Sequence, residues 1–209
     1  MSKKFNKGYK CLFYGPPGIG KTSLAKVISN HSKSRFLNLR GVESNVAEIR
    51  KSVESAESLN RLHKSTTTLF VDEIHRFNKA QQDVLLPHIE RGTVRFIGAT
   101  THNPFFYVNS PLVSRSQVFE LKPLEEKDLS NLIKVTLEDK ERGLGNLKIK
   151  ISHDAIKLLV TKSDGDARKC LNALELGVMT TTPDKNKVIR FDLNVAEESI
   201  QQKTVVYDG

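Results

Sequence analysis

The segment from Gly15 to Thr22 constrains the fold of this chain more than any other. It fits the pattern G-x-x-x-x-G-K-[ST], after an apolar run at residues 10–14 and before helical spacing at 21–30. Its glycines let backbone N–H groups gather around a phosphate, and the helix N-terminus adds positive partial charge. We expect Lys21 to neutralise the β- and γ-phosphates and Thr22 to be a ligand of Mg²⁺. The expected nucleotide-binding residues are Gly15, Pro16, Pro17, Gly18, Ile19, Gly20, Lys21, Thr22 and Ser23.

Two acidic residues follow the next clear strand signal. Residues 67–71 are apolar or β-branched, and Asp72 and Glu73 come directly after them. Ligands of open α/β sheets bind at the carboxyl ends of the strands, where these acids would lie. We expect Asp72 to organise the Mg²⁺ with its waters, and Glu73 to orient and polarise an attacking water. His75 is expected to pack or to bond at a helix start rather than to take part in the chemistry.

The strand expected at residues 94–99 ends in a second polar segment. Thr100, Thr101 and Asn103 follow it, and each carries a side chain that reaches a γ-phosphate or a water from a strand end. An ordinary exit from a strand into a loop has the same composition. These residues are therefore candidates from their place in the sequence alone.

Strand and helix signals alternate along the first part of the chain, which favours an α/β fold with a parallel sheet between helices. This is the arrangement of a P-loop NTPase. We expect strands at 10–14, 35–39, 67–71, 94–99 and 116–121, and helices at 21–30, 46–62 and 78–90.

The pattern becomes helical after Pro123, with amphipathic spacing at 125–137, 152–162, 166–176 and 195–203. We expect a nucleotide-binding domain at residues 1–122 and a small all-α lid domain at 123–179. Residues 180–209 are expected to be a tail that leads to a further domain.

The net charge and the distribution of apolar residues limit the classes of protein to which the chain can belong. The 209 residues carry 33 Lys and Arg against 24 Asp and Glu, a net charge of +9, and nine of the basic residues lie in the first 40, where there is no acidic residue. Apart from the lysines at the phosphate site, this excess is either a solubilising arm or a surface for nucleic-acid phosphates. No apolar run is long enough to span a membrane, and the N-terminus lacks the apolar part of a secretory signal. The candidates for backbone contact are Lys3, Lys4, Lys7 and Lys10.

The two cysteines, Cys11 and Cys170, fit buried free thiols in a reducing compartment better than a disulfide. The histidines and cysteines lack the spacing of metal ligands, so we expect no structural zinc.

Three motifs together resemble one family. They are Gly-Pro-Pro-Gly-x-Gly-Lys-Thr at 15–22, Asp-Glu-Ile-His-Arg-Phe-Asn-Lys-x-Gln-Gln-Asp at 72–83, and Gly-Ala-Thr-Thr-x-Asn-Pro at 98–104. This combination resembles an AAA+ ATPase of the clamp-loader clade. More closely, it is similar to the RarA/MgsA group, which includes the Werner-helicase-interacting ATPases. The resemblance implies ATP as the nucleotide and ATP hydrolysis as the activity.

The resemblance also implies roles for two arginines. Arg115, in Asn-Ser-Pro-Leu-Val-Ser-Arg-Ser, is similar to an arginine finger that enters the ATP site of a neighbouring subunit, so active sites would be shared in a homo-oligomer. Arg168, in Gly-Asp-Ala-Arg-Lys-Cys-Leu-Asn, is similar to the sensor 2 arginine, which contacts the γ-phosphate of its own subunit. Without the resemblance, Arg115 is an ordinary surface arginine.

The chain differs from the family pattern in three places. It begins about ten residues before the phosphate-binding segment, and it ends where the family's C-terminal oligomerisation domain would follow, so we interpret it as an ATPase core without those flanking parts. The segment at 39–45 carries Arg40 and Asn45 where the family has small polar residues and a glycine.

These observations predict an intracellular ATPase that maintains DNA replication and recombination at stalled or damaged forks. Its expected partners are forked, gapped or single-stranded DNA, bound through phosphates without sequence preference, and replication or repair proteins. It would lie in the nucleus of a eukaryote, or in the cytoplasm and nucleoid of a bacterium. Two alternatives stay open: a nucleotide-binding or regulatory fragment that does not hydrolyse ATP, and a clamp-loader or branch-migration subunit.

Overall fold

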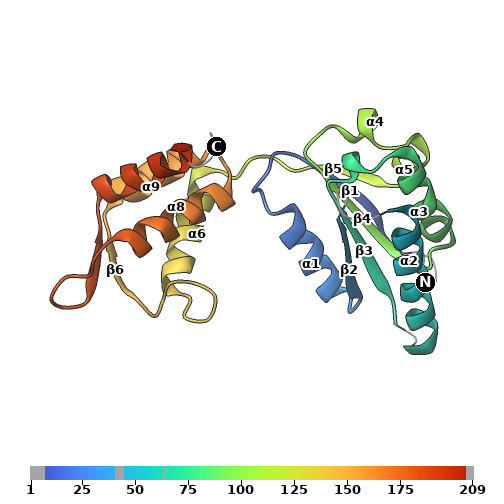
Figure 1. The fold of residues 1–209 in the computed structure, drawn as a ribbon, viewed down its shortest axis with the longest axis horizontal. Coiled ribbons are helices and arrows are strands. Elements are labelled where there is room, and N and C mark those ends of the chain that lie inside the picture. Colours follow the sequence, from blue (N-terminus) through green and yellow to red (C-terminus); the bar gives the residue numbers. More distant parts are fainter. Residues whose placement is uncertain (1–7, 41–44, 64, 206–209) are drawn as a thin grey trace, which may run out of the picture. The chain divides into compact units, whose positions relative to one another are not determined.

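The computed structural model describes residues 8–40, 45–63 and 65–205. The chain divides into two compact units, and the main division falls between Leu121 and Lys122. The first unit contains Met1–Pro16 and Gly20–Leu121, and the second contains Pro17–Ile19 and Lys122–Gly209. Each is described by itself. Figure 1 labels their elements.

A five-stranded sheet forms the centre of the first unit, in the order β2-β3-β4-β1-β5, and all its strand pairings are parallel. This confirms the predicted P-loop NTPase sheet, and the elements differ from the expected ranges only at their ends. The strands are β1 (Lys10–Tyr14), β2 (Arg35–Arg40), β3 (Thr67–Asp72), β4 (Arg95–Thr100) and β5 (Gln117–Glu120). The helices are α1 (Lys21–His31), α2 (Val46–His63), α3 (Lys79–Arg91), α4 (Pro104–Tyr107) and α5 (Ser110–Ser114), with a 3₁₀ turn η1 (Ile74–Arg76).

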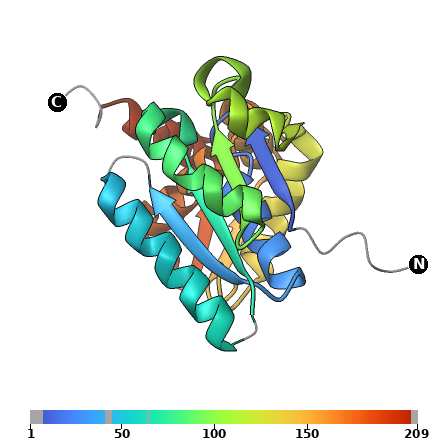
Figure 2. The same ribbon diagram turned by 90° about the vertical axis from the view of Figure 1, so that its right-hand side faces the viewer.

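Side chains of the sheet alternate between two apolar cores, because successive residues of a strand point to opposite faces. Leu12 and Phe96 belong to the core that α2 and α3 cover, whereas Phe13 and Ile97 belong to the core on the α1 side. Figure 1 shows α1 on one face of the sheet and α2 and α3 on the other, and Figure 2 shows α2 and α3 in front of the strands. Burial on both faces explains why these strands read as apolar runs in the sequence.

Side-chain caps set the starts of two helices. At α3, Asn78 Oδ1 accepts from the Gln81 N–H at 2.9 Å, and Gln81 Oε1 accepts from the Asn78 N–H at 2.8 Å. At α2, Asn45 and Glu48 make the same reciprocal pair, at 2.9 and 3.0 Å. Each box satisfies two backbone donors that a helix start otherwise leaves unpaired. Asn45 therefore has a structural role, while residues 41–44, between it and β2, lie outside the described residues.

The second unit is mostly helical, but the expected all-α lid needs a correction. Besides α6 (Glu126–Glu138), α7 (His153–Ser163), α8 (Ala167–Thr180) and α9 (Leu193–Val205), it contains a parallel two-stranded sheet of β6 (Lys148–Ile151) and β7 (Val188–Phe191). In this sheet Ile149 pairs with Ile189. Such short strands carry a weak alternating pattern, and each needs a partner far along the chain, so local periodicity does not reveal them.

The segment expected as a tail at 180–209 contains β7 and α9, and α9 covers the helix expected at 195–203. Phe191 and Ala196 are buried in the apolar core of the second unit, together with Leu129 and Leu174. Over its described part, this segment therefore belongs to the second unit rather than standing apart from it.

The two cysteines are buried free thiols, as predicted, and burial raises the pKa of both. Within the described residues, every helix is too short or too polar to cross a membrane.

Candidate nucleotide-binding site

The phosphate-binding segment leaves β1 and enters α1 through a left-handed glycine. Gly20 has φ +91° and caps the N-terminus of α1, a conformation that favours glycine. A Cβ added at Gly20 would have no neighbouring atom within 4 Å, so the space beside this backbone is open. The Gly15 N–H donates to the Thr100 carbonyl at 3.2 Å, which ties the start of the loop to the end of β4. The result is an open cradle at the carboxyl edge of the sheet, of the kind that binds phosphate.

Lys21 lies inside this cradle. Its Nζ donates to the carbonyl oxygens of Gly15 and Pro16, each at 2.7 Å, and only 8% of the residue is exposed. The loop thus holds the ammonium group among its own backbone atoms.

Thr22 and Asp72 meet at the same edge, although 50 residues separate them in sequence. Thr22 Oγ1 donates to Asp72 Oδ2 at 3.3 Å, and Asp72 Oδ1 accepts from the Glu73 N–H at 3.1 Å. A hydroxyl and a carboxylate are the hard oxygen ligands that Mg²⁺ prefers, with phosphate oxygens and waters completing its shell. The donor set therefore fits Mg²⁺.

Glu73 has a backbone conformation that is unusual for its residue type. Its φ is +49° and its ψ +50°, which for a residue other than glycine costs on the order of 1–3 kcal/mol. This left-handed residue joins β3 to η1 and turns the chain sharply at the sheet edge. Its Oε2 lies 3.5 Å from Thr101 Oγ1 and 3.1 Å from His75 Nδ1.

The three candidates after β4 have different surroundings. Thr101 contacts Glu73, as above. Thr100 is fully buried, and its hydroxyl accepts from the His102 N–H at 3.0 Å. The side-chain oxygen of Asn103 accepts from the Phe105 N–H at 3.1 Å and so caps α4. The structure therefore brings Thr101 to Glu73 and uses the oxygen of Asn103 in a local cap.

Sequence reasoning missed the involvement of His75 in this site. Its Nδ1 lies between Glu73 Oε2, at 3.1 Å, and Thr100 Oγ1, at 2.9 Å. The only signal in the sequence was its place two residues after Glu73, and that spacing points to no particular contact. The sharp turn at Glu73 is what brings the ring back to the carboxylate.

Arg115 lies at the end of α5, with its side chain 43% exposed. Its Nε pairs with Glu90 Oε1 on α3 at 2.7 Å, and its Nη1 donates to the Pro111 carbonyl at 3.1 Å. The guanidinium thus lies on the surface, away from the described contacts of Glu73, and its role at another subunit stays a prediction.

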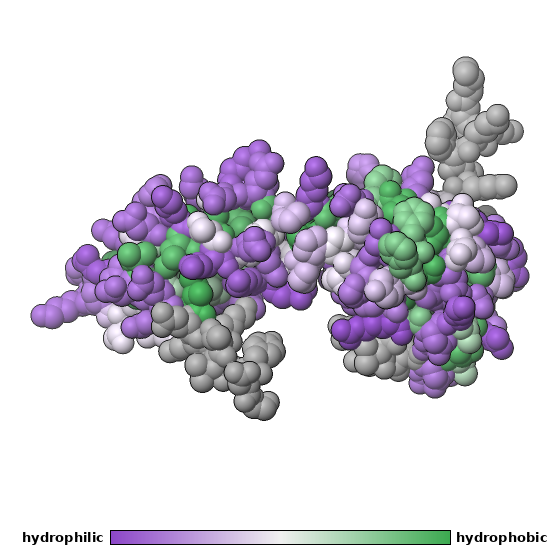
Figure 3. Space-filling model, turned by 90° about the horizontal axis from the view of Figure 1, so that it is seen from above, coloured by the Kyte–Doolittle hydropathy of each residue, from purple (hydrophilic) through white to green (hydrophobic). Residues whose placement is uncertain are grey.

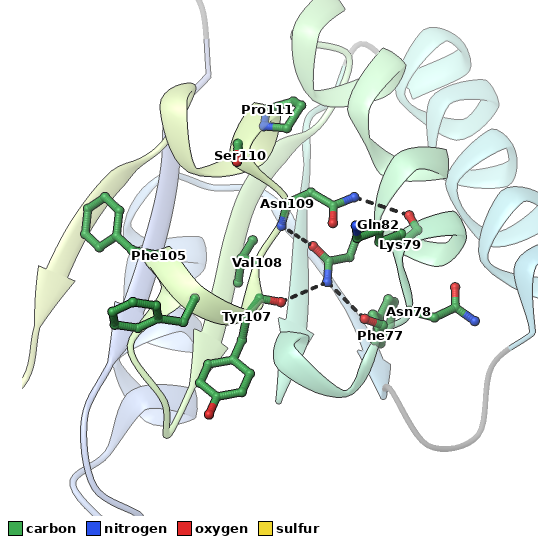
Figure 4. Close-up of a pocket in the computed structure, with 11 residues that line it drawn as sticks. Phe77, Asn78, Lys79, Gln82, Phe105, Tyr107, Val108, Asn109, Ser110 and Pro111 are labelled. Carbon is green, nitrogen blue, oxygen red and sulfur yellow. Dashed lines mark hydrogen bonds between the residues drawn. The ribbon is translucent and has the colours of Figure 1, made fainter.

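Gln82, one residue of the motif at 72–83, connects α3 by hydrogen bonds to the segment that leads to Arg115. Its amide group donates to the carbonyls of Phe77, at 2.9 Å, and Tyr107, at 3.4 Å, and its Oε1 accepts from the Asn109 N–H at 2.7 Å (Figure 4). Asn109 Nδ2 donates in turn to Asp83 Oδ1 at 2.7 Å. A buried glutamine thus satisfies three backbone groups, one just before α3 and two in the segment from Tyr107 to Asn109.

An aromatic surface lies beside this clamp. Phe105, Phe106 and Tyr107 of α4 are 66, 81 and 53% exposed, and Figure 3 shows a hydrophobic patch over α4. Together with the start of α3 and residues 108–111, α4 borders an open hollow of about 570 Å³ (Figure 4).

Arg168 belongs to the second unit. It lies in the first turn of α8, where the side chain of Asp166 accepts from the Lys169 N–H at 2.9 Å and caps the helix. The predicted helix start is confirmed, and the sensor 2 role stays a prediction from the resemblance.

Comparison with known protein families agrees with this geometry. Residues 11–124 match the profile of the ATPase family associated with various cellular activities (AAA), and residues 145–209 match that of the AAA C-terminal domain. The chain belongs to the AAA family of ATPases. The AAA match spans β1 to the end of the first unit and includes the whole cradle, so the family predicted from the three motifs is confirmed.

Curated relatives of this AAA chain carry related names. It is 41% identical over 201 residues to the Replication-associated recombination protein A of Haemophilus influenzae, covering 96% of this chain and 44% of that protein. It is 45% identical to the protein of that name in Escherichia coli, covering 80% of this chain and 37% of that protein. The ATPase WRNIP1 of Dictyostelium discoideum is 44% identical over 167 residues, 80% of this chain and 19% of that protein. The AAA chain thus spans less than half the length of these relatives.

A solved structure shows the same architecture. The Holliday junction branch migration motor RuvB of Thermotoga maritima superposes with a TM-score of 0.71 at 25% identity, covering 93% of this AAA chain and 61% of that chain.

Proposed function

We propose that this chain binds ATP and Mg²⁺ in the cradle of the first unit and hydrolyses ATP at the interfaces of a homo-oligomer. The contact between Thr22 and Asp72, beside Glu73, supports the proposal, because a hydroxyl and two carboxylates lie together at one edge of the sheet. Lys21 would neutralise the β- and γ-phosphates, and Glu73 would orient and polarise the attacking water. Mg²⁺, when bound, would neutralise charge on the phosphates.

Two further residues would complete the reaction centre. Arg115 would stabilise charge on the γ-phosphate of a neighbouring subunit, which its exposed position supports. Arg168 would contact the γ-phosphate of its own subunit, and Thr101 or Asn103 would contact the γ-phosphate or the water. The contact of Thr101 with Glu73 favours Thr101.

We further propose that the ATPase acts on DNA during replication and recombination inside the cell, with replication or repair proteins as further partners. The names of the curated relatives support this process. The basic first 40 residues would contact phosphates, although Lys3, Lys4 and Lys7 lie outside the described residues and Lys10 begins β1. Forked, gapped or single-stranded DNA would be bound without sequence preference, because phosphate contacts carry no base information.

The first test is steady-state ATP hydrolysis with and without forked or gapped DNA, with Lys21→Ala as the blank. We expect turnover that rises with DNA and disappears in the variant. A rate of ATP hydrolysis that is the same with and without DNA would support the ATPase activity but contradict the proposed action on DNA. ATP binding without turnover would favour the alternative, a nucleotide-binding or regulatory fragment.

The likeness to RuvB supports branch migration as a second candidate function. Movement of a synthetic four-way DNA junction in the presence of ATP would test it.

The shared active site has its own test. Arg115→Ala and Glu73→Gln should each lower turnover strongly, and a mixture of the two variants should recover part of it. Recovery is expected because some mixed interfaces pair an intact Glu73 with an intact Arg115 from the other chain. Arg50→Ala, a change of an exposed arginine on α2, is the matched control and should retain activity. Absence of any recovery on mixing would contradict an arginine that acts on another subunit.

A further inference from the structure

His75 lies where the chain turns back at the edge of the sheet. Ile74 is fully buried and anchors η1, while Glu73 is left-handed, so the ring of His75 returns to the Glu73 carboxylate. The side chain of His75 is only 13% exposed, and that of Glu73 is 34% exposed. A nearly buried ring therefore contacts a carboxylate that is more exposed to solvent than the ring is.

The hydrogen bonds around His75 assign its proton. The Thr100 hydroxyl donates to the His102 carbonyl at 3.3 Å and accepts from the His102 N–H at 3.0 Å. A carboxylate can only accept, so the contact with Glu73 Oε2 and the use of the Thr100 proton at the His102 carbonyl favour the tautomer in which His75 Nδ1 carries the hydrogen. It then donates to Thr100 Oγ1 at 2.9 Å, and Glu73 Oε2 lies 3.1 Å from the same nitrogen, close enough for the polar N–H to attract the carboxylate.

The charge state of His75 agrees with this assignment. Burial lowers the pKa of His75 and the charge of Glu73 raises it, while His102 and Arg76 add to the lowering, so the net shift is downward. The ring is therefore neutral at pH 7, with one hydrogen to donate.

Aromatic neighbours hold the plane of the ring. The His75 ring meets His102 edge-on, with centroids 4.5 Å apart and planes at 82°, and it lies 6.4 Å from the Tyr107 ring. The His102 and Tyr107 rings are 4.9 Å apart. Because these neighbours come from the segment after β4, the direction of the Nδ1–H bond depends on that segment.

Both side-chain contacts of Glu73 fall on the same oxygen. His75 Nδ1 and Thr101 Oγ1 approach Oε2, and the described residues supply no hydrogen bond to Oε1. A general base needs a fixed direction, since a displacement of about 1 Å in an active site can lower the rate about 100-fold. We propose that His75 is a positioning residue, whose Nδ1–H fixes the Glu73 carboxylate so that Oε1 takes the water that attacks ATP. This inference rests on the proposed ATP hydrolysis.

Two substitutions separate this role from simple packing. His75→Phe keeps a ring against His102 and Tyr107 but removes the N–H donor. His75→Asn loses the ring but places an amide N–H close to the position of Nδ1. Positioning predicts that kcat falls about 10- to 100-fold in His75→Phe and largely recovers in His75→Asn. A packing role predicts the reverse order.

The experiment measures single-turnover and steady-state ATP hydrolysis by the 209-residue chain, together with the affinity for a fluorescent ATP analogue and the melting temperature. We expect KM and nucleotide affinity in His75→Phe to match the wild type, so that the loss lies in kcat. His75→Phe should also add nothing to Glu73→Gln, because a positioning residue has no effect once the group it positions is disabled.

The outcomes distinguish this inference from the proposed function. If the wild type hydrolyses ATP and His75→Phe does so at the same kcat, the positioning role is wrong while the proposed function stands. An increase of kcat in His75→Phe would also overturn it, because it would make the contact inhibitory. If the wild type binds ATP without turnover, the proposed hydrolysis and this inference fail together.

Discussion

The two ends of the sheet in the first unit both carry polar side chains, but their hydrogen bonds differ. At the amino end, Thr68 Oγ1 lies 2.6 Å from both Tyr9 OH and Ser34 Oγ, and Ser34 bonds further to Ser29. These hydroxyls donate to and accept from one another, and Thr68 is fully buried.

At the carboxyl end, the two contacts that hydroxyl groups make with the acidic side chains are longer. Thr22 Oγ1 is 3.3 Å from Asp72 Oδ2, and Thr101 Oγ1 is 3.5 Å from Glu73 Oε2. Here the backbone is also strained at Glu73 and open at Gly20. Buried polar groups that satisfy each other stabilise a fold, whereas oxygens with capacity to spare serve ligands. The comparison assigns structure to the amino end and chemistry to the carboxyl end.

The largest expected effect belongs to the carboxyl end. Glu73→Gln should lower the rate of ATP hydrolysis about 10²- to 10⁴-fold, the usual contribution of a general base, because an amide cannot accept the water's proton. ATP affinity and unfolding free energy should stay close to those of the wild type. Single-turnover hydrolysis, nucleotide titration and urea unfolding test this together. A rate within about 10-fold of the wild type would remove Glu73 from its assigned role.

A change at the amino end should have the opposite profile. Thr68→Val keeps the shape of the side chain but removes one hydrogen-bond partner from Tyr9 and one from Ser34, which should lower the unfolding free energy by about 0.5–1.5 kcal/mol for each lost bond. The rate of hydrolysis by the folded protein should not change. Thr66→Val, at an exposed position just before β3, is the matched control and should be near neutral. A slower rate with unchanged stability would contradict the comparison.

A polar cluster between α2 and α3, formed by Glu57, His88, Arg91 and Thr93, provides a second structural test, in which stability is measured against pH. Burial raises the pKa of Glu57, but hydrogen bonds from Thr93 and His88 and the charges of His88 and Arg91 lower it by more, so the net shift is downward. A carboxylate with a lowered folded-state pKa stabilises the fold above its unfolded pKa of about 4.3 and loses that contribution as pH falls through the folded value. Glu57→Gln should therefore be less stable than the wild type at pH 7, with the difference shrinking below about pH 4.

Urea unfolding of both proteins between pH 3 and 7 measures this difference. A gap that stays constant over the whole range would mean that the ionised carboxylate contributes nothing through its charge. ATP hydrolysis at pH 7 should be the same in both proteins. The side chains of this cluster bond to one another, as those at the amino end of the sheet do, and we expect no part for them in the reaction.

The candidate site could be predicted in part because many of its residues lie close together in the sequence. Residues 15–22 are consecutive, and Asp72 and Glu73 directly follow a strand, so their place at the sheet edge comes from the strand order of any parallel α/β fold. The contact partners of His75 and Gln82 could not be predicted in this way. Thr100 is 25 residues from His75, and Asn109 is 27 from Gln82, and no local periodicity links residues so far apart.

Local patterns likewise determined most of the fold. The apolar runs and the helical spacing placed most strands and helices from sequence alone, because periodicity depends on near neighbours. The β6–β7 pairing and the packing of Phe191 into the second core were decided by tertiary structure, since each needs a partner distant in the chain. The same holds for Asn103 and Thr101, which look equivalent in the sequence. The path of the chain after β4 brings Thr101 to the Glu73 carboxylate and Asn103 to the start of α4, and the turn at Glu73, with its φ of +49°, brings His75 back to within 3.1 Å of the same carboxylate.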